Sequence, residues 1–253
     1  VFASGINIDG KKVLVLGSGG ASKAVCAALR ELGASEIIVI SRNGPIDYDC
    51  LSLHPDTDVI VNTTPVGMYP DNLRKPVSLK SFPKLTGVLD IIYNPKLTGL
   101  LLEAENLSIP HAGGLHMLVA QAKASFEIFF DRRLPNSVVA DIVNKLQGEM
   151  ENIILTGMPG CGKSTIAKAL SVATGREVID IDTEIEKTNR RSCAEIITKY
   201  GEEKFRKLEH EEILKHCKES GKIIALGGGA VLDSENHPAI RQNGKIFFIR
   251  RDV

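Results

Sequence analysis

Short apolar runs alternate with amphipathic segments along the first half of the chain. Patterns typical of buried strands lie at residues 12–16, 36–40, 58–62 and 88–93. Patterns typical of helices lie at residues 21–32, 98–106 and 115–130. Residues 43–57 show no helical pattern, so a loop is expected to connect the second strand to the third. This alternation predicts a parallel sheet with helices on its faces.

The same alternation starts again in the second half. An amphipathic helix is predicted at 137–147, and Gly148 with the polar residues after it separates this helix from new strands. The new strands are expected at residues 153–155, 178–181, 223–226 and 245–249, with helices between residues 183 and 220. We therefore predict two α/β domains, at residues 1–148 and 149–253.

Both ends of the sequence indicate a segment of a longer polypeptide. The chain begins at Val1 rather than at Met, and residues 1–10 lack the pattern of a signal peptide. It stops directly after its last predicted strand. A parallel sheet that ended on an uncovered strand would be an incomplete domain, so we expect truncation at both ends.

The composition excludes several classes of partner. Lys+Arg and Asp+Glu are equal at 31 each, so no net field attracts nucleic acid or an anionic membrane. No apolar run approaches 18 residues, which argues against a membrane span. The five cysteines are scattered and include no CxxC pair, which favours reduced thiols in a cytoplasmic protein.

A glycine-rich loop joins the first predicted strand to the first helix. It consists of Gly17, Ser18, Gly19, Gly20 and Ala21. Glycines here allow backbone N–H groups to approach a pyrophosphate, which would lie on the positive end of the helix. Ser22 stands where this dinucleotide-binding pattern usually has glycine or alanine. The motif alone also fits an ordinary structural turn.

The end of the second strand indicates which dinucleotide is bound. An NAD site has an Asp or Glu here, which accepts a hydrogen bond from the ribose 2′-hydroxyl. This chain has Ser41, Arg42 and Asn43 instead. The guanidinium of Arg42 can bind a 2′-phosphate through two parallel hydrogen bonds, which favours NADP. The alternative is an arginine exposed in a polar turn.

Four segments, in this order, resemble the cofactor-binding half of the shikimate dehydrogenase family. They are GSGGAS at 17–22, NTTPVGM at 62–68, DIIYNP at 90–95 and HAGGLHMLVAQ at 111–121. The likeness covers residues 5–146 and implies a Rossmann-type domain that binds NADP. It implies that residues 17–21 hold the pyrophosphate and residues 41–43 the 2′-phosphate.

The same resemblance implies further roles around the cofactor. It places Asn62 and Thr63 along the cofactor. The residues beside the nicotinamide would be Ile91, Gly114 and Met117. Tyr93 and Gln121 would reach the substrate, and the reaction would be reduction of 3-dehydroshikimate by NADPH. Plainer alternatives are a half-buried strand tyrosine for Tyr93 and a core methionine for Met117. The family's catalytic Lys and Asp lie in a substrate domain that this sequence lacks, so we expect NADP(H) binding without turnover.

A second glycine loop, GMPGCGKST at 157–165, follows a predicted strand and opens a helix. It satisfies the phosphate-loop pattern G-x-x-x-x-G-K-[ST]. The backbone would surround the phosphates of ATP, Lys163 would neutralise their charge, and the Ser164 hydroxyl would bind Mg²⁺. The expected nucleotide-binding residues are Gly160, Cys161, Gly162, Lys163, Ser164 and Thr165.

Polar residues farther along indicate the phosphate acceptor. Asp180 and Asp182 stand two apart at the end of a predicted strand, so both carboxylates are expected on one face. One could hold Mg²⁺ and the other could orient or deprotonate a hydroxyl, while Asp182 could also cap a helix. Arg206 could bind a substrate or pair with Glu202 or Glu209 on a solvated helix face. The triple glycine at 227–229 could admit a substrate to the backbone or form a flexible turn.

This ordered set resembles the shikimate kinase family over residues 152–253. The resemblance implies a P-loop NTPase-type parallel sheet in which Lys163 is catalytic and Asp180 and Ser164 hold Mg²⁺. Asp182, Arg206 and Gly228 would bind shikimate, with Asp182 as the base and Arg206 on the substrate carboxylate. The family's lid and second carboxylate-binding arginine are missing from the sequence, so we expect severely reduced kinase activity.

The prediction is therefore a bifunctional enzyme of the shikimate pathway. Its cofactors would be NADP(H), ATP and Mg²⁺, and its partners 3-dehydroshikimate, shikimate and the rest of the parent polypeptide. One alternative is a P-loop kinase for another small hydroxylated metabolite, such as gluconate or a nucleoside. The other is a non-catalytic pair of domains that binds NADP and ATP.

Overall fold

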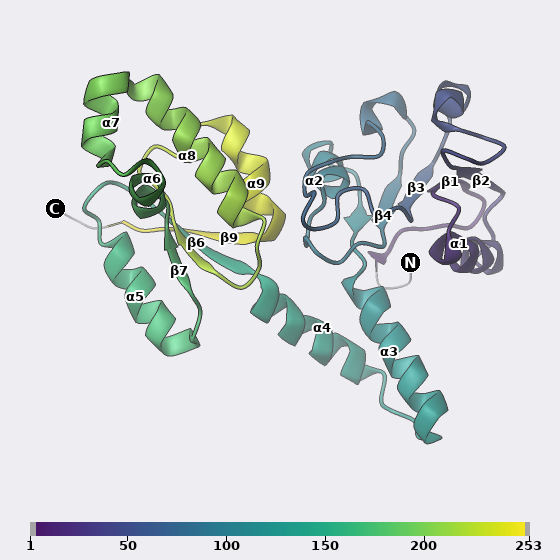
Figure 1. The fold of residues 1–253 in the computed structure, drawn as a ribbon. Coiled ribbons are helices and arrows are strands. Elements are labelled where there is room, and N and C mark those ends of the chain that lie inside the picture. Colours follow the sequence, from purple (N-terminus) through teal and green to yellow (C-terminus); the bar gives the residue numbers. More distant parts are fainter. Residues whose placement is uncertain (1–3, 251–253) are drawn as a thin grey trace. The chain divides into compact units, whose positions relative to one another are not determined.

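The computed structural model describes residues 4–250 of the 253, and the chain divides into two compact units (Figure 1). The units are Val1–Lys145 and Leu146–Val253. Helix α4 (Ser137–Met150) crosses from one unit into the next. Gly148, expected to follow this helix, lies inside it, because the helical turns continue to Glu151, whose N–H donates to the Gln147 carbonyl at 2.9 Å.

The first unit contains a five-stranded parallel sheet, in the order β2-β1-β3-β4-β5. Its strands are β1 (Lys12–Leu16), β2 (Glu36–Ile40), β3 (Val59–Asn62), β4 (Gly87–Asp90) and β5 (His111–Ala112). Its helices are α1 (Gly20–Glu31), α2 (Gly99–Asn106) and α3 (Leu115–Phe130), with a short 3₁₀ helix, η3, at Leu79–Ser81. The parallel sheet and the three helices were predicted from the sequence pattern.

Alternation along the strands separates the core of this unit into two layers. Leu14 and Leu16 of β1 belong to a cluster that includes Leu100 and Leu101 of α2. Val13 and Val15 belong to another, which includes Leu29 of α1. Because successive side chains of a strand point to opposite faces, α1 and α2 cover opposite faces of the sheet. Both faces are buried, as the near-continuous apolar strands require.

The connection between β2 and β3 contains no α-helix, as predicted. A 3₁₀ helix, η2 (Tyr48–Leu53), takes its place, and the Asp47 side chain caps it by accepting from the Asp49 N–H at 3.0 Å. Ile46, Tyr48 and Leu51 pack, partly buried, against the α2 side of the sheet. Three apolar side chains thus replace the usual crossover helix.

The second unit contains a four-stranded parallel sheet in the order β7-β8-β6-β9. Its strands are β6 (Asn152–Thr156), β7 (Val178–Asp180), β8 (Ile223–Ala225) and β9 (Gly244–Phe248). Its helices are α5 (Lys163–Thr174), α6 (Ile181–Asn189), α7 (Cys193–Tyr200), α8 (Glu202–Cys217) and α9 (His237–Asn243), with the 3₁₀ helix η4 at Ser234–Asn236. Leu155 and Ile223 pack on Ala167 of α5. Figure 1 shows α8 and α9 across the sheet from α5.

Several elements differ from the sequence-based expectation. Strand β4 ends at Asp90 rather than at Tyr93, because the Asp90 carboxylate accepts from the Ile92 N–H and turns the chain away from the sheet. Strand β5 has two residues and gives no periodic signal. Helix α9 was missed, although Pro238 lies in its first turn, where proline is favoured. Within residues 4–250, no helix combines the length and apolar composition that a membrane crossing needs.

Candidate functional sites

The residues expected to bind NADP lie at the carboxyl ends of four neighbouring strands. Leu16 pairs in register with Ile40 and with Asn62, and Asn62 pairs with Asp90. The residues that follow these four form a row along one edge of the sheet, namely Gly17, Ser41, Thr63 and Ile91. Open parallel sheets bind ligands at this edge, where the strand order reverses beside β1.

The first glycine loop contains two kinds of glycine. Gly17 has φ +105°, and a Cβ there would lie 2.8 Å from Thr63 Oγ1, so the fold itself requires glycine. At Gly19 and Gly20, a Cβ would have no other atom within 4 Å. Helix α1 begins at these residues without a side-chain cap and without an acidic residue in its first turn. The open space and the uncapped helix end fit a pyrophosphate.

The turn after β2 separates a buried serine from two exposed polar residues. Ser41 is buried, and its N–H donates to the Ile46 carbonyl at 3.1 Å. Arg42 and Asn43 are exposed at the mouth of the sheet. Burial raises the pKa of the neighbouring Tyr48, and the positive charge of Arg42 opposes this shift. Arg42 is therefore close to Tyr48 but remains accessible to a phosphate in solution.

A buried polar cluster that we did not predict supports this edge of the sheet. Asp90 is 2% exposed and accepts hydrogen bonds from Asn62 Nδ2 at 3.1 Å, the Ile92 N–H at 3.0 Å and Thr98 Oγ1 at 2.8 Å. The Asn62 Oδ1 atom in turn accepts from the N–H and hydroxyl of Thr64. Asn62 thus braces the edge from inside, because it is fully buried and cannot lie directly along a cofactor through its side chain.

The loss of the Asp90 proton is expected to make the first unit less stable as the pH rises. Burial raises the pKa of Asp90 from 3.8 to about 6, against the three hydrogen bonds that favour its ionised form. The folded state therefore binds a proton that the unfolded state has already lost between these two values. The free energy of unfolding should fall by about 3 kcal/mol across this window.

Asp90→Asn tests this titration, because the amide has nearly the same shape and stays neutral. We expect the variant to gain about 3 kcal/mol over the wild type between pH 4 and pH 7. Urea denaturation followed by hydrogen exchange of β3 and β4 would measure it. A difference that stays constant with pH would show that folding does not raise the pKa of Asp90.

The nicotinamide side of the predicted site gathers residues from β4 and α3. The Gly114 N–H donates to the Ile92 carbonyl at 2.8 Å, and a Cβ at Gly114 would overlap the Ile91 carbonyl oxygen. Met117 and Gln121 lie one turn apart on α3. Met117 and Tyr93 are each 44% exposed, so Met117 is not a core residue, and Tyr93 lies beyond the end of β4. Met117 is therefore not the core methionine of the plainer alternative, and Tyr93 is not on a strand.

The second glycine loop has the strand–loop–helix context of a phosphate loop. Gly160 and Gly162 have φ +76° and +97°, conformations that favour glycine, and a Cβ at either would have nothing within 4 Å. Lys163 Nζ donates to the carbonyls of Gly157 at 2.8 Å and Met158 at 3.1 Å. Its ammonium is therefore held at the loop by neutral oxygens that a phosphate can replace. The open space and the charge fit the phosphates of a nucleotide.

A hydroxyl and a carboxylate meet beside this loop. Ser164 Oγ donates to Asp180 Oδ2 at 3.0 Å, and Asp180 Oδ1 accepts from the Thr183 N–H at 3.3 Å as the cap of α6. Hard oxygen atoms of this kind are the ligands that Mg²⁺ prefers, so the pair fits this ion. Of the two predicted roles, helix capping thus belongs to Asp180 rather than to Asp182.

The geometry predicted for the two aspartates was wrong. Strand β7 ends at Asp180, and Asp182 lies in the first turn of α6, so strand periodicity does not relate them. Asp182 still faces the same region, since the charges of Lys163 and Arg206 both lower its pKa. The surrounding protein atoms and the Asp180 carboxylate outweigh them and raise that pKa, although the side chain reaches solvent. Asp182 is thus a carboxylate with increased basicity between the two loops.

Arg206 forms both of the ion pairs that its sequence position allows. Its Nη1 donates to Glu209 Oε2 at 2.7 Å and its Nη2 to Glu202 Oε1 at 3.0 Å. The solvated helix face that was one of the alternatives is found only in part, because the Glu209 side chain is 1% exposed. Sequence reasoning named Glu209 only as a possible partner, and its spacing of three residues from Arg206 was the available signal.

The triple glycine packs directly against these groups and is not a loose turn. A Cβ at Gly227 would overlap Glu209 Oε1 and would lie 3.1 Å from Asp182 Oδ1. One at Gly228 would lie 3.0 Å from Pro159 of the phosphate loop, and one at Gly229 would lie 2.7 Å from Arg206 Nη2. The glycines therefore bring the phosphate loop, Asp182 and Arg206 together around one surface.

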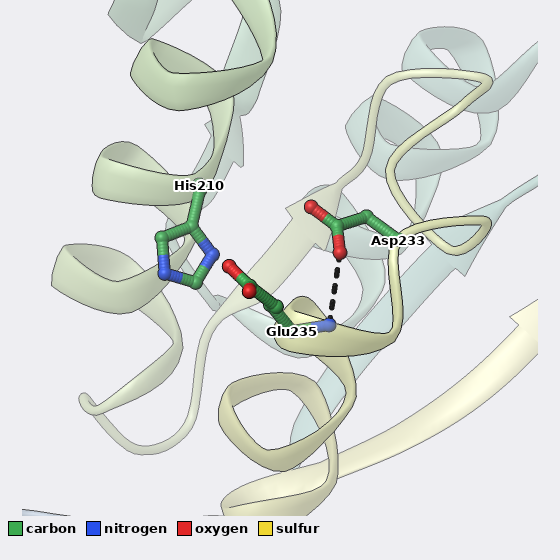
Figure 2. A group of neighbouring side chains, drawn as sticks. All are labelled: His210, Asp233 and Glu235. Carbon is green, nitrogen blue, oxygen red and sulfur yellow. Dashed lines mark hydrogen bonds between the residues drawn. The ribbon is translucent and has the colours of Figure 1, made fainter.

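A third group of metal-ligand residue types lies outside both loops. Figure 2 shows His210 of α8 facing Asp233 and Glu235, and one ligand atom from each lies within 4.8 Å of the others. Asn236 Nδ2 donates to the Ala230 carbonyl, so its Oδ1 must accept from His210 Nδ1 at 2.7 Å. Asp233 Oδ1 accepts from the Glu235 N–H at 2.9 Å. These bonds fix the turn before α9 and engage Nδ1 of His210, so a metal could be bound by this histidine through Nε2 alone.

Comparison with known proteins assigns different relatives to the two parts of the chain. Residues 159–253 match a family model described as "Shikimate kinase". A shikimate kinase of Caldanaerobacter subterraneus subsp. tengcongensis is 42% identical over 101 residues, which are 40% of this chain and 59% of the relative. The NADP(+) shikimate dehydrogenase of the same organism is 34% identical over 167 residues, 57% of each chain.

A solved structure gives the same assignment for the N-terminal part. The crystal structure of shikimate dehydrogenase 1 from Peptoclostridium difficile has 35% identity and a TM-score of 0.54, and the match covers 57% of each chain. The chain spans between half and three fifths of the length of the curated relatives it matches. It therefore joins a Rossmann-like segment related to shikimate dehydrogenases, in its N-terminal part, to a P-loop segment related to shikimate kinases, in its C-terminal part.

Proposed function

We propose that the two units belong to a bifunctional enzyme, in which the first binds NADPH and the second binds ATP with Mg²⁺. The main support is the same arrangement in both units. At the carboxyl edge of each sheet lies a glycine loop with open space at its glycines, and the helix that follows has no side-chain cap at its N-terminus. Relatives of the two parts are named for NADP-dependent shikimate dehydrogenase and for shikimate kinase. The reactions would be the reduction of 3-dehydroshikimate and the phosphorylation of shikimate.

In the first unit, we assign the residues of the row to successive parts of NADPH. Residues 17–21 would bind the pyrophosphate, residues 41–43 the 2′-phosphate, and Thr63 would contact the cofactor between them. Ile91, Gly114 and Met117 would form the surface beside the nicotinamide, which supplies a hydride when the cofactor is bound. The exposed side chains of Tyr93 and Gln121 would contact the substrate.

In the second unit, the groups around the triple glycine would receive a small hydroxylated acid. Lys163 would neutralise the transferred phosphate, residues 160–165 would surround it, and Ser164 with Asp180 would hold Mg²⁺, which stabilises charge on the phosphates. Arg206 and Gly228 would bind the acid. Asp182 would orient or deprotonate the acceptor hydroxyl, and its raised pKa makes it a better base than an ordinary aspartate.

The two proposed reactions are consecutive, because the alcohol made by the first is the phosphate acceptor of the second. The proposed location is the cytoplasm, where thiols stay reduced, and the five cysteines are free thiols. Further segments of the parent polypeptide would contribute groups for catalysis, and each unit would bind its own small molecules through the residues named above.

Arg42→Ala tests the choice of dinucleotide. We expect the dissociation constant for NADPH to rise about 10- to 100-fold, because hydrogen bonds between ionised partners contribute roughly 1.5–3 kcal/mol. Affinity for NADH should change little, since it carries no 2′-phosphate. Calorimetric titration would measure both, with Arg30→Ala, an exposed arginine at the other end of α1, as the control. Equal losses for the two dinucleotides would contradict the assignment of Arg42.

A further inference from the structure

Arg206 is held by two carboxylates with very different exposure to solvent. The side chain of Glu209 is 1% exposed, that of Glu202 is 70% exposed, and that of Arg206 is 37% exposed. Glu209 bonds Nη1 from the buried side, while Glu202 bonds Nη2 from the solvent side. The two pairs are chemically alike, so their different surroundings decide what each can do.

Glu209 has no freedom to release the guanidinium. Its second oxygen, Oε1, is buried without a hydrogen-bond partner and lies against Gly227. Movement of Glu209 would break the bond to Arg206 and leave a second buried oxygen unpaired, which is costly. Glu202, in the first turn of α8, can instead rotate into water at small cost, because exposed ion pairs contribute little to stability.

The solvent side of Arg206 is also where an anionic ligand must approach. The guanidinium packs against Gly229 on one face, and Glu209 closes its buried end. Nη2, which Glu202 bonds, lies on this solvent side of the guanidinium. Asp182 adds a third carboxylate close enough for its charge to act on Glu209, so an incoming anion meets excess negative charge.

We propose that Glu202 is a placeholder for the carboxylate of the substrate. Its carboxylate occupies the Arg206 donor that the substrate takes, and binding exchanges one carboxylate for the other while Glu209 keeps the guanidinium in position. Glu202 thereby lowers the affinity for an acidic substrate and shields Arg206 from other anions. This inference rests on the proposed function of the second unit, since it requires a substrate with a carboxylate.

Glu202→Gln removes the competing charge and keeps the size of the side chain. We expect shikimate to bind about two- to fivefold more tightly, the range set by the small contribution of exposed ion pairs. The neighbouring Glu203→Gln is a matched control, because Glu203 also lies in the first turn of α8 and pairs with Lys207 at 2.8 Å, away from Arg206. The control should leave the dissociation constant for shikimate unchanged.

Titration calorimetry with shikimate and with its neutral methyl ester separates the explanations. Exchange of carboxylates predicts that E202Q tightens shikimate alone and leaves the methyl ester and ATP unaffected. If E202Q binds the acid and the ester more tightly by the same factor, or does not bind the acid more tightly, the role of Glu202 is overturned. The proposed function would still stand in that case, provided that the wild type binds shikimate. Failure of the wild type and both variants to bind shikimate at millimolar levels would overturn the proposed substrate, and this inference with it.

Discussion

Lys163→Ala is expected to weaken the binding of ATP by about 100-fold, because loss of a charged partner from a desolvated phosphate site costs several kcal/mol. In the structure the Lys163 ammonium donates to the carbonyls of Gly157 and Met158. We expect ATP to replace these two neutral oxygens with phosphate oxygens, which bind an ammonium more strongly. Calorimetric titration of Mg–ATP into wild type and variant measures the difference.

Lys168→Ala controls for the loss of a positive charge from the same helix. Lys168 lies on α5, like Lys163, but is exposed and outside the phosphate loop. It should leave the affinity for ATP within about twofold of the wild type, as expected for a screened surface charge. Both variants should bind NADPH normally. An ATP affinity that Lys163→Ala lowers by less than about threefold would argue against phosphate binding at this loop.

Gly114→Ala is expected to destabilise the first unit by about 3 kcal/mol or more, because the added methyl group would overlap backbone atoms. The Cβ would meet the carbonyl group of Ile91, and no flexible side-chain end is available to yield. Either the start of α3 or the segment after β4 must move, and both carry residues assigned to the nicotinamide. The variant should therefore unfold at a lower temperature than the wild type and should bind NADPH more weakly.

Gly19→Ala separates this packing effect from a general effect of losing a glycine. Gly19 has φ −77° as the residue before α1, and a Cβ there would have no other atom within 4 Å. The same methyl group should therefore leave the thermal unfolding temperature unchanged. Unfolding temperatures that match for wild type and Gly114→Ala would show that the Ile91 contact has no structural role.

The strand pattern predicted most of the fold because both sheets are parallel and buried on both faces. Continuous apolar runs are typical of strands that are buried on both faces of a parallel sheet, and this chain has EIIVI at residues 36–40 and VLVL at 13–16. Their glycine loops could be located for the same reason, since each follows a buried strand and precedes a helix. The sequence also indicated that no α-helix connects β2 to β3, because residues 43–57 show no helical pattern.

The parts that sequence did not reveal depend on contacts between distant residues. Asp182 follows a strand by two positions, but the cap at Asp180 starts α6 immediately and moves Asp182 onto a helix. Asp90 looked like an ordinary strand end, and its partner Asn62 is 28 residues away in the chain. Helix spacing allowed Arg206 either of two partners, and only burial shows that the two pairs differ.

Titration of one sample with NADPH and then with Mg–ATP shows whether the chain carries two separate nucleotide sites. We expect one equivalent of each nucleotide to bind, with neither displacing the other. Arg42→Ala should weaken only the first binding event, and Lys163→Ala only the second. Release of NADPH by ATP, or the absence of binding by both at millimolar concentration, would contradict the claim that the chain carries two separate nucleotide sites.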